Sequence, residues 1–154
     1  AYGYHGLGEV FVFLFFGIVA VTGGLFLYTA RLDMLSLLPA SAIGLLSAGV
    51  LNLNNMRDAD GDRQAGKHTL ASRMSLGAGK AFQCAMVTLA MVLVVAYMGM
   101  TYHAFLWYLP AALCLINVPL TLQIRERIDA DRLLKILSIS TLAMAAVFSI
   151  VLNV

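Results

Sequence analysis

The stretch from residue 54 to residue 70 carries the residue types and the spacing that metal and phosphate chemistry needs. It holds three carboxylates and three fixed cations in a chain whose charged fraction is only 12%: Asp58, Asp60, Asp62, Arg57, Arg63 and Lys67. If the preceding helix continues through this stretch, Asp58 and Asp62 share a face, while Asp60 points elsewhere. Two carboxylates on one face favour a cation between them, and Mg²⁺ binds through one or two carboxylates together with substrate phosphates. The stretch therefore predicts a site for Mg²⁺ and a diphosphate.

The basic and amide side chains of the same stretch are candidates for binding the diphosphate. Arginine offers a planar fork and lysine a point charge to phosphate oxygens, which suggests this role for Arg57, Arg63 and Lys67. Asn54 and Asn55 have two interpretations: their amides cap the end of a membrane helix, or their oxygens help to bind Mg²⁺ or an aromatic hydroxyl. Because a pair of aspartates is a weak motif by itself, a charged loop that only orients membrane helices is the alternative.

The rest of the chain is apolar enough to lie in a membrane. Its 154 residues are 61% hydrophobic, with a mean hydropathy of +0.88, whereas roughly a quarter of the residues in soluble domains are charged. This composition predicts an all-α, multi-span transmembrane helix bundle formed by a single domain over residues 1–154. The net charge of +2 gives no reason to expect a nucleic-acid partner. Cys84 and Cys114 have no metal-binding spacing and are predicted to pack as small hydrophobes.

Five uncharged apolar runs are each long enough to cross a bilayer core of about 30 Å as a helix. They cover residues 10–28, 34–53, 81–100, 104–122 and 136–154. The segments between them are predicted to be a short loop or helix at 71–80, a turn at 101–103 and a charged connector at 123–135. Asn117, inside the fourth run, is predicted to form a hydrogen bond to another helix.

The basic residues fall almost entirely on one side of the predicted membrane. Nine of the ten lie in the connectors on the side of the amino terminus and only Arg31 lies on the other; the nine are Arg57, Arg63, Lys67, Arg73, Lys80, Arg125, Arg127, Arg132 and Lys135. Lys and Arg accumulate in the cytoplasmic loops of membrane proteins. The distribution therefore places the amino terminus, the 54–70 stretch and the 123–135 connector in the cytoplasm.

Two segments resemble motifs of the UbiA-type intramembrane prenyltransferases. The first meets every fixed position of the family's second aspartate-rich motif, NNxRDxxxDxxxGKxTL, from Asn54 to Leu70. The second, Gly6-Leu7-Gly8-Glu9 followed by Phe15-Phe16-Gly17, is similar to the segment that enters the family's fifth helix, although His5 stands where Lys or Arg is expected. Within the family, the first motif resembles that of the members that prenylate 1,4-dihydroxy-2-naphthoate in menaquinone synthesis.

This resemblance implies a fold and an activity. The five predicted spans correspond to helices five to nine of a nine-helix fold in a bacterial inner membrane. The implied reaction transfers a polyprenyl group from polyprenyl diphosphate to 1,4-dihydroxy-2-naphthoate with decarboxylation, giving demethylmenaquinone. The implied roles are Mg²⁺ binding for Asp58 and Asp62, neutralisation of the leaving group for Arg57, Arg63 and the catalytic Lys67, and ordering of the metal shell for Asn54 and Asn55.

The resemblance also implies an incomplete active site. The family's first aspartate-rich motif does not occur between Ala1 and Val154, so the other half of the site is expected on a missing amino-terminal half of the same protein. Two alternatives stay open from the sequence: prenyl transfer to another aromatic acceptor such as 4-hydroxybenzoate, and a non-catalytic membrane fragment.

Overall fold

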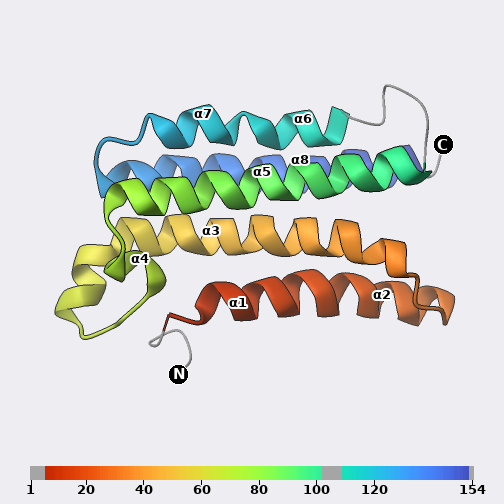
Figure 1. Ribbon diagram of the computed structural model, residues 1–154, viewed down its shortest axis with the longest axis horizontal. Coiled ribbons are helices and arrows are strands. Elements are labelled where there is room, and N and C mark those ends of the chain that lie inside the picture. Colours follow the sequence, from red (N-terminus) through yellow and green to blue (C-terminus); the bar gives the residue numbers. More distant parts are fainter. Residues whose placement is uncertain (1–5, 102–108, 153–154) are drawn as a thin grey trace.

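The computed structural model is a bundle of long helices that run nearly parallel to one axis (Figure 1). It describes residues 6–101 and 109–152, which contain no strand. The first rod consists of α1 (Gly8–Val12), a π-helical stretch (Phe13–Val19) and α2 (Ala20–Thr29). A single 3₁₀ turn (Met34–Ser36) leads into α3 (Leu37–Gln64), which is followed by α4 (Leu70–Arg73) and α5 (Leu76–Thr101). The chain ends with α6 (Leu109–Leu115), α7 (Asn117–Leu122), another 3₁₀ turn (Arg127–Asp129) and α8 (Ala130–Leu152).

Four helical segments of the described residues are long and apolar enough to cross a membrane. They are Gly8–Thr29, Met34–Gln64, Leu76–Thr101 and Arg127–Ile150, and they confirm an all-α, multi-pass membrane protein. The predicted span 104–122 lies partly outside the described residues, as does the turn at 101–103 except Thr101, which ends α5. The described part of this span is interrupted at Ile116. Pro119 has no N–H to donate to the Leu115 carbonyl, which explains the break between α6 and α7.

Three predicted boundaries are wrong because charged residues extend the helices. The second span continues beyond Leu53 to Gln64 and takes most of the acidic stretch into α3. The segment 71–80 contains the short helix α4, but α5 already begins at Leu76. The connector 123–135 ends early, since α8 begins at Ala130 and not at residue 136. Asp129 explains this last start: its carboxylate accepts hydrogen bonds from the backbone N–H groups of Arg125 and Glu126 at 2.9 and 3.0 Å.

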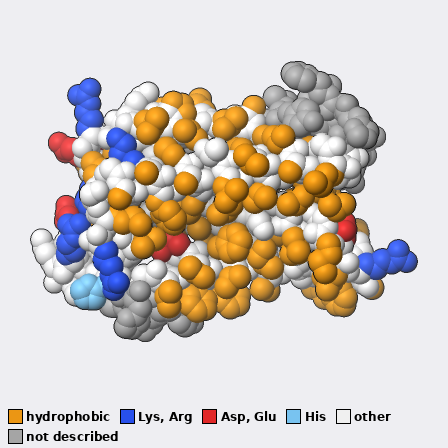
Figure 2. Space-filling view, in the orientation of Figure 1, with side chains coloured by type: hydrophobic (Ala, Val, Ile, Leu, Met, Phe, Trp, Pro, Cys, Tyr) orange, Lys and Arg blue, Asp and Glu red, His pale blue; other side chains and the backbone are white. Residues whose placement is uncertain are grey.

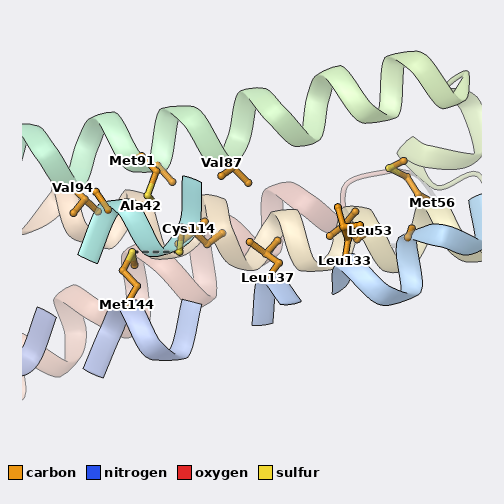
Figure 3. Packing of buried hydrophobic residues seen from close by; sticks show 14 of the residues in the cluster. Ala42, Leu53, Met56, Val87, Met91, Val94, Cys114, Leu133, Leu137 and Met144 are labelled. Carbon is orange, nitrogen blue, oxygen red and sulfur yellow. Dashed lines mark hydrogen bonds between the residues drawn. The ribbon is translucent and has the colours of Figure 1, made fainter. Parts of the chain in front are cut away.

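Helix α3 is the centre of the bundle. It contacts the first rod on one side and α5 and α8 on the others. The core at these contacts consists of fully or nearly buried side chains, which Figure 3 shows pointing toward one another: Leu53, Met56, Val87, Met91, Val94, Leu137 and Met144. Cys114 is buried against Met144 as predicted, whereas Cys84 is half-buried. The hydrogen bond predicted for Asn117 is confirmed, since its amide donates to Ser140 Oγ on α8 at 2.9 Å.

The first rod meets α3 backbone to backbone. A Cβ atom added to Gly17 would lie 2.5 Å from Gly44 Cα, so only glycine fits at this crossing. Small residues allow this close approach between membrane helices. The crossing fixes the position of α1 beside the last turns of α3, where the motif residues lie. Charged side chains gather at this end of the molecule, while hydrophobic ones cover its length (Figure 2).

Candidate functional site

The last turns of α3 carry the predicted site clear of the membrane core. With 28 residues, α3 is about 42 Å long at 1.5 Å per residue, which exceeds a hydrocarbon core of about 30 Å. The polar turns therefore extend beyond the apolar part of the bundle while keeping helical geometry. Because the helix continues past Asn54 and Asn55, the interpretation of these amides as caps is wrong.

Arg57 connects three polar side chains at this end of α3. Its guanidinium forms a fork with the Asp58 carboxylate, with Nε to Oδ1 at 2.7 Å and Nη2 to Oδ2 at 2.9 Å. The same guanidinium donates to Asn54 Oδ1 and to Asp131 Oδ1, both at 2.9 Å. Asp131 belongs to α8 and is also bound by Lys135 at 2.8 Å. Two neighbouring helices thus hold Arg57, Asp58 and Asn54 in one arrangement.

Asp62 and Lys67 form a second ion pair, which depends on the way in which α3 ends. Lys67 Nζ lies 3.2 Å from Asp62 Oδ1. The chain reverses here through Gly66, at a φ of +72°, and the backbone N–H groups of Gly66 and Lys67 donate to the carbonyls of Arg63 and Asp62. This is the glycine-dependent helix ending in which two backbone bonds satisfy the last free carbonyls. It returns the lysine toward the helix that carries both aspartates.

Asp60 and Arg63 lie apart from these pairs. As predicted, Asp60 points elsewhere: its carboxylate contacts Arg63 at 2.7 Å and Arg127 at 3.8 Å. Arg63 also donates from Nε to the Ser72 carbonyl at 2.7 Å, which ties α3 to α4. The structure therefore brings Asn54, Arg57 and Asp58 together and brings Asp62 and Lys67 together, but it does not place Arg63 among them. A diphosphate-binding role for Arg63 stays a prediction.

The oxygen donors of this region fit a Mg²⁺ ion that shares its shell with water and phosphate. The Asp58 side chain is 43% exposed and is open to solvent, whereas the Asp62 side chain is only 12% exposed and is mostly buried. The described residues offer no group of three or more His, Cys, Asp or Glu side chains that would hold a metal by themselves. Mg²⁺ commonly keeps several waters and binds through one or two carboxylates plus substrate phosphates. The donor set suits this mode and not an all-protein cage.

An apolar groove of about 480 Å³ starts at Asn54 and runs along the bundle. Its walls come from α1 and the π-helical stretch on one side and from α8 on the other, with α3 as its floor; the lining residues are Val12, Phe16, Ser47, Val50, Leu51, Asn54, Leu134, Ser138 and Thr141. Asp58 lies one turn beyond Asn54 on the same face of α3. The groove therefore ends at the polar cluster, and its volume is that of a small-molecule site.

Asp131 and Glu9 were not among the predicted site residues. Asp131 was predicted to lie in the charged connector 123–135, although its spacing of four from Lys135 is a helical signal. Glu9 is the carboxylate that precedes the first apolar run. It is only 5% exposed, and its Oε1 accepts a hydrogen bond from Asn55 Nδ2 at 2.9 Å. The position of Glu9, a charged residue at the start of a membrane helix, was the feature of the sequence that could have indicated a buried polar role.

We expect Gly66→Ala to lower the free energy of unfolding by about 1–3 kcal/mol, with little change in membrane insertion, because a side chain at positive φ costs this much. Relief of this strain would also move Lys67 away from Asp62. The matched control is Gly61→Ala, at a helical position where an added Cβ has no neighbour within 4 Å. Thermal unfolding of both variants in detergent, followed by circular dichroism, checks the prediction. Equal stabilities would contradict it.

Comparisons with known proteins agree with the motif and the fold. The model of the UbiA prenyltransferase family matches residues 1–139. The chain is 40% identical over 108 residues to the 1,4-dihydroxy-2-naphthoate octaprenyltransferase of Haemophilus influenzae, covering 70% of this chain and 35% of the relative. It is 37% identical over 132 residues to the protein of the same name from Mycobacterium leprae, covering 86% and 42%.

A more distant relative is the UbiA prenyltransferase domain-containing protein 1 homolog of Drosophila melanogaster, at 29% identity over 147 residues, which cover 96% of this chain and 39% of the relative. The chain spans about a third to two fifths of these relatives and matches their carboxy-terminal portion. No solved structure gives a significant match. The family match, which extends over most of the chain, shows that this protein belongs to the UbiA prenyltransferase family.

Proposed function

We propose that this chain supplies the carboxy-terminal part of a Mg²⁺-dependent polyprenyltransferase. The reaction transfers a polyprenyl group from polyprenyl diphosphate to 1,4-dihydroxy-2-naphthoate, releases diphosphate and CO₂, and gives the hydroquinone form of demethylmenaquinone. The observation that carries the proposal is the apolar groove that ends at Asn54, beside the cluster of Arg57 and Asp58. An apolar wall beside a charged end suits a donor that has an isoprenoid tail and a diphosphate head.

The charged residues stabilise the departing diphosphate. Mg²⁺, when bound by Asp58 and Asp62, would supply positive charge to the leaving-group oxygens. Arg57 and Lys67 already lie against these carboxylates and would donate to the phosphate oxygens as negative charge develops on them. Arg63, which is 47% exposed, would reach the same diphosphate by turning from Asp60. Asn54 and Asn55 keep the arginine and the first rod in place around the site.

The groove protects the reacting prenyl group from water. Loss of diphosphate leaves an allylic cation, which water would capture if it had access. Apolar side chains such as Val12, Phe16 and Leu51 form most of the groove lining, to which Ser47, Ser138 and Thr141 add hydroxyl groups. The electron-rich aromatic acceptor is the nucleophile that captures the cation in this proposal. The acceptor assignment draws on the printed names of the bacterial relatives, and 4-hydroxybenzoate is the competing acceptor in the test below.

We further propose that an amino-terminal half completes the site. The relatives are longer than the chain, and the most apolar window of the first rod is only 6% buried, so much of its surface is free to contact lipid or further helices. The distribution of Lys and Arg supports an orientation in the bacterial inner membrane with the charged end in the cytoplasm. The same orientation gives the site access to soluble Mg²⁺ and diphosphate.

The experiment is a radiolabelled prenyl-transfer assay in membranes that contain this chain together with the amino-terminal half of the Haemophilus influenzae relative. We expect transfer to 1,4-dihydroxy-2-naphthoate with Mg²⁺ and its loss, to background, with EDTA. An equimolar amount of 4-hydroxybenzoate should not compete. The chain alone is the control and should be inactive. Transfer that persists in EDTA would contradict the metal requirement, and no transfer despite proven insertion of both halves would contradict the proposed reaction.

A further inference from the structure

Glu9 is a buried carboxylate that uses only one of its two oxygens. Its Oε1 accepts a hydrogen bond from Asn55 Nδ2 at 2.9 Å. Its Oε2 is buried and has no hydrogen-bond partner among the described residues, and Glu9 takes part in none of the salt bridges found there. Leaving a buried polar atom unpaired costs about 1–3 kcal/mol, and more for a charged group. Such an oxygen needs an explanation, and a ligand that donates a hydrogen bond to it supplies one.

The position of Glu9 relates it to the apolar groove. It precedes Val12 by three residues on α1, so the two share a helical face, and Val12 lines the groove. Asn55, its partner, adjoins Asn54 at the groove's polar end. Glu9 therefore lies on α1 one helical turn before the groove residue Val12, while Arg57 is held toward the opposite wall by Asp131 of α8. The two walls offer different chemistry: a hydrogen-bond acceptor on one and a cation on the other.

The different chemistry of the two walls indicates which group of a ligand would bind at each of them. An ionised carboxylate only accepts hydrogen bonds and repels a diphosphate, which belongs with the cations of α3. An aromatic hydroxyl is a donor, and its ring fits the apolar wall formed by Val12 and Phe16. With Oε1 bound by Asn55, the second oxygen, Oε2, is the acceptor that remains for a ligand hydroxyl.

We propose that Glu9 binds a ring hydroxyl of the aromatic acceptor and orients the ring in the groove. This inference rests on the proposed function and deepens it by assigning the acceptor's position. The carboxylate accepts a hydrogen bond from the hydroxyl and raises the electron density of the ring, and Asn55 holds the carboxylate in place. A site that hydrogen-bonds a substrate hydroxyl discriminates strongly against an analogue that lacks it.

The test is equilibrium binding to this chain in lipid nanodiscs under anaerobic conditions, without any prenyl donor. The probes are 1,4-dihydroxy-2-naphthoate and 2-naphthoate, which lacks both hydroxyls. We expect the chain to bind the dihydroxy compound about tenfold or more tightly than 2-naphthoate. Glu9→Gln keeps the oxygen that Asn55 binds but replaces the free acceptor with a donor. This variant should bind the two probes with about equal affinity, and its affinity for 2-naphthoate should be unchanged. Glu126→Gln, in the connector before α8, is the matched control and should keep the preference.

Three results would overturn the inference: no preference in the unmodified chain, the full preference in Glu9→Gln, or an equal loss of affinity for both probes in that variant. If Glu9→Gln does not insert into the membrane, Glu9→Asp is the second variant, because its side chain is one carbon shorter and places the carboxylate farther from the ligand. The measured quantity is again the ratio of the affinities for the two probes. Failure of the proposed function is separate. It appears as absent prenyl transfer in the two-half assay, whereas the hydroxyl preference is measured without any transfer.

Discussion

Asp58→Asn and Asp62→Asn are each expected to reduce prenyl transfer by about 10²–10³-fold, the loss seen when one preorganised charge-stabilising group is removed from an active site. Asparagine keeps the size of the side chain and one oxygen, but it removes the negative charge that attracts Mg²⁺. The measurement is single-turnover transfer in membranes that contain this chain and an amino-terminal half, at saturating Mg²⁺ and donor.

Asp60→Asn is the internal control for this pair. Asp60 lies between the two aspartates in sequence but is 68% exposed and pairs with Arg63 and Arg127. We expect its replacement to change transfer by less than about threefold, since pairs between exposed charges contribute about 0–1 kcal/mol. Wild-type activity in both Asp58→Asn and Asp62→Asn would exclude the proposed metal site. A loss of the same size in all three variants would indicate a general effect of charge at this end of the molecule.

The second large effect is expected from a polar pair that lies deep between α3 and α5. Asn52 Nδ2 donates to Gln83 Oε1 at 2.9 Å, and both residues are 0% exposed. Asn52→Leu leaves the Gln83 amide without this partner in an apolar core, which should lower the free energy of unfolding by about 1–3 kcal/mol. Thermal unfolding of the chain in detergent, followed by circular dichroism, measures the change.

The double variant Asn52→Leu/Gln83→Leu separates the cost of an unpaired group from the value of the pair. Replacement of both partners by apolar groups is nearly neutral when the shapes fit, so we expect the double variant to recover most of the stability lost in Asn52→Leu. Gln83→Leu alone completes the comparison. A loss in the double variant equal to the sum of the losses in the two single variants would show that the amides contribute through packing alone. Transfer activity should follow stability in this series, because neither residue lies in the polar cluster.

The helix boundaries show where local sequence patterns were insufficient. Residues 54–64 contain charges and a glycine that are compatible with either a loop or an exposed helix, and the structure continues α3 through them to Gln64. Contacts from elsewhere in the chain favour the helix, including the bond from Asn55 to Glu9 and that from Arg57 to Asp131. Such partners are distant in sequence and have no local signature. The early start of α8 has a local cause, since the Asp129 carboxylate accepts hydrogen bonds from the backbone N–H groups of Arg125 and Glu126.

The sequence by itself determined the membrane class, the all-α fold and the location of the charged end, because apolar runs and the distribution of Lys and Arg are properties of the chain and need no partner. For a helix over this stretch, the helical period also places Asp58 and Asp62 on one face apart from Asp60, and the tertiary structure decided that the stretch is a helix. Only the tertiary structure decided which cation each aspartate meets, that Arg63 turns to α4, and that Glu9 is buried beside Asn55. These outcomes depend on which helices become neighbours. Close packing, such as that of Gly17 on Gly44, determines the neighbours, and it exists only in the assembled bundle.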